Sequence, residues 1–177
     1  MNSWLMRALV VALLSAYFLH CAATPTAWHF IDGVNLIFHE AGHAIFIFFG
    51  QFIHILMGSG FQVLLPLLIS GHFFYTKQRV SGAIALMWAG QSLINVSVYA
   101  GDAIVMQLPL LGGDNSFHDW NYLLSTLGIL RWTPEIAQTF YATGVAMILA
   151  GIGLACVFLK QDYKPGSLSW SQGKKKY

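Results

Sequence analysis

Charged residues and cysteines are scarce in this sequence. Of its 177 residues, 9% are Asp, Glu, Lys or Arg, whereas a soluble domain contains about 25%. The two cysteines, Cys21 and Cys156, lie in apolar segments and form neither a disulfide framework nor a CxxC metal site. Internal repeats are absent, and a net charge of +2 gives no basis for nucleic-acid binding.

Apolar residues dominate instead. They make up 56% of the chain, and the mean hydropathy is +0.61. These values predict an all-α, polytopic membrane helix bundle with five to six transmembrane segments and a short half-helix. We expect one transmembrane domain at 1–160 and a flexible, basic, cytoplasmic tail at 161–177.

Five apolar runs are long enough to be read as spans. The first could instead be a signal peptide, although we favour a retained helix. The third is interrupted by Gly58-Ser59-Gly60 and Pro66, so it is either one kinked span or a re-entrant hairpin followed by a span. The half-helix at 122–130 could become a sixth span. The five runs are 4–23, 28–49, 52–75, 82–107 and 136–159.

The basic residues predict an orientation. With five spans, Arg7 and Arg131 lie on one side, and the other seven Lys and Arg residues lie on the opposite side. The excess of Lys and Arg marks the cytoplasmic side, so we expect a cytoplasmic carboxyl terminus and an outside amino terminus.

The sequence His39-Glu40-Ala41-Gly42-His43 is the most informative motif, and it lies near the middle of the second run. Residues four apart share one face of a helix, so His39 and His43 can bind one ion. Glu40 can then take a proton from an activated water. The alternative interpretation is a helix that carries two unrelated histidines and a glutamate. An unpaired glutamate in a membrane-length apolar segment is costly, however, so its presence indicates a functional site with a binding partner. We therefore predict a zinc site.

Further polar residues lie in the second and fourth runs. Asp32 and Asn35 extend the two histidines into a stripe that should face the bundle interior. Gln91 and Asn95 are expected to join helices by hydrogen bonds. Asp102 needs a cation or a metal as its partner.

A zinc site of this kind needs a third protein ligand. His118 and Asp119 are the candidates, because they belong to the densest cluster of acids and histidines outside the second run. Asp119 could instead be a charge at a helix amino terminus. Behind these two we place Asp114, Asp102 and Asn95 as alternative ligands or as groups that hold a ligand. His54 and His72 are expected to be interfacial residues without a metal.

The motif resembles that of the site-2 protease group, the M50-type intramembrane zinc metallopeptidases. The resemblance covers the motif helix well and the rest of the bundle loosely. It implies His39 and His43 as zinc ligands and Glu40 as general base. The family's third ligand is an aspartate in an Asn-Pro-Asp-Gly or Leu-Asp-Gly stretch, whereas this chain has Leu111-Gly112-Gly113-Asp114 and then His118-Asp119-Trp120.

The sequence therefore predicts a zinc-dependent intramembrane metalloprotease. Its partners would be membrane lipids and a transmembrane protein substrate, with no nucleic acid, in the cytoplasmic membrane of a prokaryote. Three alternatives stay open: a zinc hydrolase of a lipid amide or ester, a non-enzymatic zinc-binding scaffold, and a metal transporter.

Overall fold

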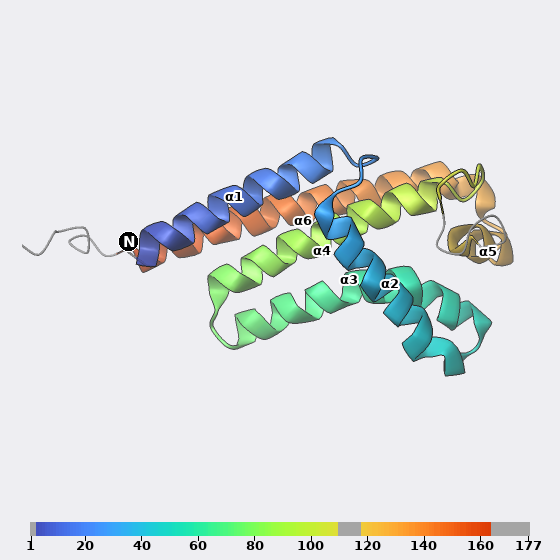
Figure 1. The fold of residues 1–177 in the computed structure, drawn as a ribbon, viewed down its shortest axis with the longest axis horizontal. Coiled ribbons are helices and arrows are strands. Elements are labelled where there is room, and N and C mark those ends of the chain that lie inside the picture. Colours follow the sequence, from blue (N-terminus) through green and yellow to red (C-terminus); the bar gives the residue numbers. More distant parts are fainter. Residues whose placement is uncertain (1–2, 110–117, 164–177) are drawn as a thin grey trace, which may run out of the picture.

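A computed structural model describes residues 3–109 and 118–163 of the chain, and these residues form α-helices without any strand. The all-α fold class is therefore confirmed. Figure 1 shows the helices as an elongated bundle with one short helix, α2, lying obliquely across it. The α-helices are α1 (Ser3–Ala23), α2 (Phe30–Phe46), α3 (Gln51–Tyr75), α4 (Arg79–Gly101), α5 (Asp119–Thr126) and α6 (Thr133–Asp162).

Within the described residues, four helices are long and apolar enough to cross a membrane. The expected count of five to six spans is wrong by at least one, because α2 is not among them. α5 has eight residues and is the expected half-helix, although it begins at Asp119 rather than 122. The four candidate spans are Trp4–Ala23, Gln51–Tyr75, Arg79–Gly101 and Leu130–Asp162.

The second apolar run forms a short helix because its carboxyl end is interrupted. α2 has 17 residues, which gives about 26 Å of helix. A 3-10 turn, η1 (Ile47–Phe49), follows it, and Gly50 then turns the chain into α3 with a φ of 86°. Only glycine adopts such a backbone conformation at little cost.

The core lies between α4 and α6, which pack closely along their length. Gly90 and Gly144 face each other, and a Cβ on either would lie 2.5 Å from the other's carbonyl oxygen. Small residues allow helices in a membrane to approach in this way. Met87, Ile94 and Ile148 fill the space beside the glycines and are fully buried.

The third apolar run forms one continuous helix, α3, which includes Gly58, Gly60 and Pro66. The alternative of a re-entrant hairpin is therefore wrong. α3 and α4 are joined by a short turn at Lys77 and lie side by side in Figure 1.

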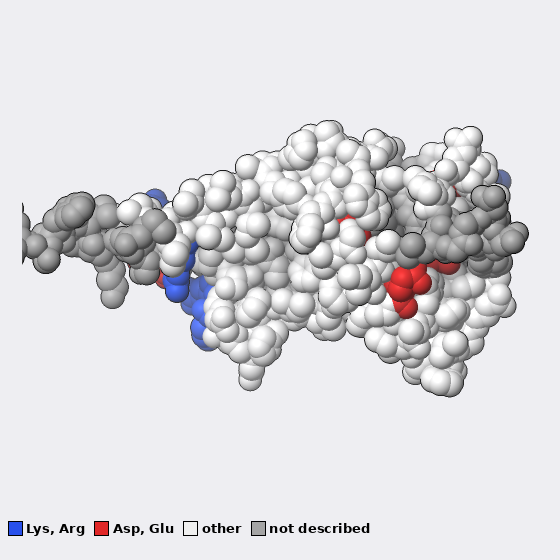
Figure 2. Space-filling model, viewed as in Figure 1, with Lys and Arg blue, Asp and Glu red and all other residues white. Residues whose placement is uncertain are grey.

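Both ends of the described chain lie at the same end of the bundle, whereas the five-span prediction places the two termini on opposite sides. The guanidinium Nη1 of Arg7 lies 3.2 Å from Oδ2 of Asp162. One cavity is lined by Arg7, Lys77 and Arg79 together. We call this the basic end, and most of the visible Lys and Arg gather there in Figure 2. The five-span count failed because α2 turns back instead of crossing.

α6 continues to Asp162, two residues past the end of the expected transmembrane domain at 160. Residues 164–177, which make up most of the expected tail, lie outside the described residues.

Candidate metal centre

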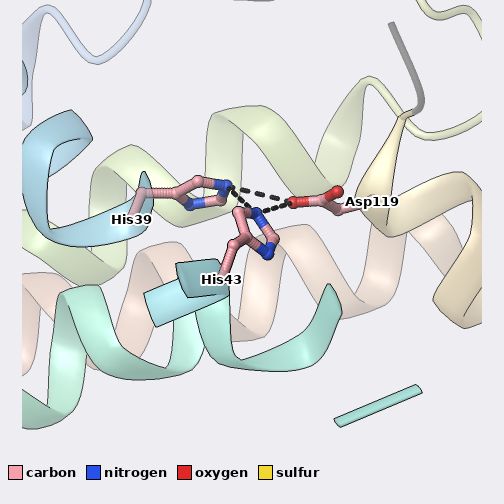
Figure 3. A group of neighbouring side chains, drawn as sticks. All are labelled: His39, His43 and Asp119. Carbon is pink, nitrogen blue, oxygen red and sulfur yellow. Dashed lines mark hydrogen bonds and ion pairs between the residues drawn. The ribbon is translucent and has the colours of Figure 1, made fainter. Parts of the chain in front are cut away.

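Three side chains converge where α2 meets α5. Nε2 of His39 lies 3.0 Å from Oδ2 of Asp119, and Nε2 of His43 lies 3.1 Å from the same oxygen. The two nitrogens are 3.0 Å apart. Figure 3 shows the three side chains pointing toward one another. We call this group the triad; within the described part of the chain it is the one group able to hold a metal ion.

A hydrogen bond fixes the tautomer of His43. Its Nδ1 lies 2.9 Å from the carbonyl oxygen of His54. A carbonyl oxygen only accepts hydrogen bonds, so Nδ1 carries the proton, and neutral His43 has its lone pair on Nε2. His54 returns the contact, because its Nδ1 donates to the carbonyl oxygen of His43 at 2.9 Å. Such a partner holds a histidine in position to bind a metal.

The shape of the triad suits an ion. Three adjacent ligands of a tetrahedral zinc, each 2.0–2.1 Å from the metal, are separated by about 3.3 Å. The observed edges of 3.0, 3.0 and 3.1 Å need to open by only a few tenths of an ångström. Lone pairs that converge this closely also repel one another unless a proton or a cation lies between them.

Gly58 of α3 lets the imidazole rings of His39 and His43 lie directly against that helix. A Cβ at this position would touch Nε2 of His43 and would lie 2.8 Å from Nε2 of His39. Two of the atoms that it would meet are the nitrogens that the triad offers to a metal ion. Gly42 has a related role, because a Cβ there would collide with the backbone of Met57 and hold α2 away from α3.

The short helix α5 holds Asp119 in place through its neighbours. The indole Nε1 of Trp120 donates to Oγ of Ser59 at 3.0 Å, which ties α5 to α3. The Asn121 side chain donates to the carbonyl oxygen of Ala103 at 2.8 Å. The backbone N–H of Asp119 itself donates to the hydroxyl of Tyr99 at 3.0 Å.

The Asp119 carboxyl is buried but stays ionised. Burial alone raises its pKa, but without a metal each of the His39 and His43 rings can donate an Nε2–H to the carboxylate, for His43 in its doubly protonated form. These interactions outweigh burial and hold the pKa of Asp119 below its usual range. An ionised carboxylate beside two imidazoles is a suitable set of donors for a divalent metal.

His118 does not join the triad, although the sequence made it a candidate ligand. Its Nδ1 accepts the backbone N–H of Asn121 at 3.2 Å, which caps α5. The proton of neutral His118 then lies on Nε2, which faces Oδ2 of Asp102 at 3.4 Å. That separation and its geometry make a weak contact rather than a hydrogen bond. Both nitrogens are thus directed away from the triad.

The other candidate residues lie around the triad or outside the described residues. Asp102 ends α4 and accepts the backbone N–H groups of Gln107 and Leu108 at 3.0 and 2.9 Å. Asn95 donates to Oδ1 of Asp32 at 3.1 Å. Asp114 lies outside the described residues.

A polar network joins α2 to α4, as the sequence predicted. The carboxylate of Asp32 accepts from Gln91 and Asn95 at 2.7 and 3.1 Å. Asn35 donates to Oε1 of Gln91 at 2.7 Å, and its own oxygen accepts from Ser92 at 2.9 Å. Each of these buried groups has a partner, so the network fixes the rotation of α2 about its axis. His39 is presented to the triad as a result.

Glu40 lies on the wall of a cavity that also contains the triad. The cavity has a volume of about 740 Å³ and includes Tyr99 and the loop at Trp28. Glu40 itself is exposed. Figure 2 shows a group of acidic atoms exposed on the surface of this half of the molecule.

The site is near the end of the bundle opposite the basic end. His39 stacks edge-on against Tyr99, with ring centroids 5.8 Å apart. Tyr99 lies two residues before the end of α4 at Gly101. Gly58 is similarly within about two turns of the start of α3.

Sequence reasoning missed the roles of Gly58 and His54. The glycine was read as an interruption and the histidine as an interfacial residue. Gly58 lies four residues after His54 on α3, so a single face carries a histidine and then a gap. The four-residue spacing of His54 and Gly58 is the sequence feature from which these two roles could have been predicted.

No protein-family model matches the chain, and no curated protein or solved structure matches it either.

Proposed function

We propose that the protein is a membrane-embedded zinc hydrolase that cleaves peptide bonds, in the manner of the M50-type metallopeptidases that its motif resembles. The observation that carries this proposal is the triad together with Gly58. Three potential ligand atoms lie within 3.1 Å of one another, and a glycine on α3 lets the two histidine rings pack against that helix in this arrangement.

Each residue has a defined task in this proposal. His39, His43 and Asp119 would hold the zinc and leave one coordination position open. His54 keeps the lone pair of His43 directed at the metal through the hydrogen bond to Nδ1. When bound, zinc supplies Lewis acidity, which activates water and polarises a carbonyl.

Glu40 would act as the general base that takes a proton from the attacking water. It accepts a proton from the attacking water and passes it to the amine nitrogen as the carbon–nitrogen bond breaks. Its position on the wall of the cavity that contains the triad supports this role. Water adds across the bond, giving a carboxylic acid and an amine, and the glutamate is regenerated.

The position of the site favours substrates cut near one membrane surface. The basic end carries Arg7, Lys77 and Arg79 and would be cytoplasmic by the positive-inside rule. The cavity of the triad would then open toward the other side. A substrate helix must unwind there to expose a carbonyl, which costs less at a surface than in the middle of the bilayer.

A lipid amide or ester is the second candidate substrate. The cavity wall includes Leu36 and Leu108 beside the triad, and apolar side chains of this kind suit an acyl chain. A scaffold without activity would use the same zinc ligands but would not need Glu40. Location in the cytoplasmic membrane of a prokaryote stays a prediction.

The test compares Glu40→Gln with wild-type protein. Both are purified in detergent, analysed for metal and assayed on fluorescent single-span peptides and on a long-chain N-acyl amide. We expect about one zinc per chain in both proteins, with peptide hydrolysis lost only in the variant. Glu135→Gln is the matched control, because Glu135 lies at the start of α6.

Each other outcome separates the alternatives. Cleavage of the acyl amide alone would favour the lipid hydrolase. Zinc without hydrolysis in either protein would favour the scaffold. Iron in place of zinc would favour the oxygen chemistry of iron(II), for which two histidines and one carboxylate are also a known donor set.

A further inference from the structure

A second cavity lies at the basic end, between the start of α1 and the start of α4. Its volume is about 640 Å³, close to that of the cavity at the triad. Three cations line it, Arg7, Lys77 and Arg79, and one carboxylate, Asp162. Nothing in the proposed hydrolysis uses this cavity.

The cations around this cavity are incompletely neutralised. Lys77 is exposed on the turn between α3 and α4, and its side chain has no hydrogen bond or ion pair with any residue that the structure describes. Arg79 donates to the neutral Oε1 of Gln161 at 3.3 Å. Arg7 has an anionic partner, Asp162, at 3.2 Å. The cavity therefore keeps a net charge of +2.

The first turn of α4 adds a further positive feature. Gln78 is its N-cap and makes no hydrogen bond from its side chain to the helix. The early backbone N–H groups of a helix lack intrahelical partners, and the helix dipole places partial positive charge there. Arg79 and Ser81, in this first turn, line the cavity.

The rest of the lining is apolar. Met6 and Val10 of α1 are 49% and 43% exposed, and Ile84 of α4 lies opposite them in the same cavity. These residues belong to helices that are long and apolar enough to cross a membrane. The cavity thus combines a cationic rim with an apolar wall formed by candidate membrane-spanning helices.

We propose that this cavity binds an anionic phospholipid, with its phosphate at Arg7, Lys77 and Arg79 and its acyl chains along Met6, Val10 and Ile84. Basic pockets between membrane helices on the cytoplasmic side recognise anionic head groups in this way. A free phosphate would contact only the cationic rim, whereas a phospholipid would also cover the apolar wall.

The test measures lipid binding to the full-length protein in neutral detergent by native mass spectrometry. The probes are dioleoyl phosphatidylglycerol, dioleoyl phosphatidylcholine and glycerol 3-phosphate. We expect phosphatidylglycerol to bind more tightly than the other two, and added salt to weaken it. Lys77→Gln and Arg79→Gln should each weaken it by about five-fold. Arg131→Gln, a cation beside Trp132 outside this cavity, should leave binding unchanged.

The exposed ion pair provides a sharper control. Arg7→Gln and Asp162→Asn break the same contact, but they change the charge of the cavity in opposite directions. We expect Arg7→Gln to weaken phosphatidylglycerol binding and Asp162→Asn to tighten it, each by about two- to five-fold. Equal weakening by both would show that the ion pair acts only on folding and would overturn the proposal.

Two further results would also overturn it. Equal binding of phosphatidylcholine and phosphatidylglycerol would mean that the cations do not recognise the head group. Binding of glycerol 3-phosphate as tight as that of the lipid would assign the cavity to a soluble phosphate.

Discussion

The two ends of the bundle hold contacts of similar length between a side-chain nitrogen and a carboxylate, in different surroundings. At the basic end, the side chains of Arg7 and Asp162 lie 3.2 Å apart and are 60% and 50% exposed. At the other end, His39 and Asp119 lie 3.0 Å apart and are 9% and 10% exposed. Exposed pairs contribute little because water screens them, whereas a buried polar group without a partner is costly. Similar distances therefore imply a dispensable contact at one end and a required one at the other.

The largest expected effect is the loss of zinc binding on substitution of Asp119. Asp119→Ala removes the carboxylate of the triad, and we expect zinc binding to be largely abolished, beyond the roughly 10–100-fold loss typical of a partner that only holds a ligand. His118→Asn is the matched control, because it removes the neighbouring imidazole but keeps a residue that caps α5 well. Metal analysis after mild chelation should show zinc in the control alone. If His118→Asn lost zinc and Asp119→Ala kept it in full, His118 and not Asp119 would be the third zinc ligand.

A second substitution tests the space beside the triad without removing a ligand. Gly58→Ala places a methyl group against Nε2 of both histidines, and we expect zinc affinity to fall by about 100-fold, as for a badly displaced ligand. Gly71→Ala in the same helix meets nothing within 4 Å and should bind zinc as wild type does. Isothermal titration with zinc measures both. Equal affinities would mean that the metal does not lie between the histidines and α3.

The third effect is on stability. Asn35→Leu removes the hydrogen-bond partner of the buried Gln91 Oε1 and of the Ser92 hydroxyl, and we expect a loss of about 2–4 kcal/mol in the free energy of unfolding. Gln51→Leu, at an exposed position at the start of α3, should change stability by less than about 0.5 kcal/mol. Unfolding by a denaturing detergent gives both values. Similar values for the two variants would show that the network is not required.

The smallest change in the free energy of unfolding is expected at the basic end. Asp162→Asn breaks an exposed ion pair, and we expect a loss of no more than about 0.5 kcal/mol. The same unfolding assay, without added lipid, measures it. A loss as large as that of Asn35→Leu would remove the contrast between the two ends.

Sequence pattern predicted the helices better than it predicted their arrangement. The spacing of Asp32, Asn35 and His39 correctly predicted one buried face, because side-chain period is a local property of a helix. The span count failed at α2, since a run of apolar residues does not reveal the turn at Gly50 that sends the chain back.

The site was only partly predictable for a related reason. The spacing of His39 and His43 is local, and the structure brings them together as expected. The choice between His118 and Asp119 depends on which residue caps α5 and which faces α2. That is set by contacts between distant segments, which a single sequence does not display.

X-ray absorption spectroscopy of the zinc-loaded protein tests the central claim most directly, because it counts the ligand types around the ion. The account predicts two imidazole nitrogens at about 2.0 Å with carboxylate and water oxygens completing the shell. In Asp119→Ala, any zinc still bound should have one fewer protein oxygen ligand. Three imidazoles around the zinc, or a sulfur ligand, would contradict the assignment of His39, His43 and Asp119 as the metal centre.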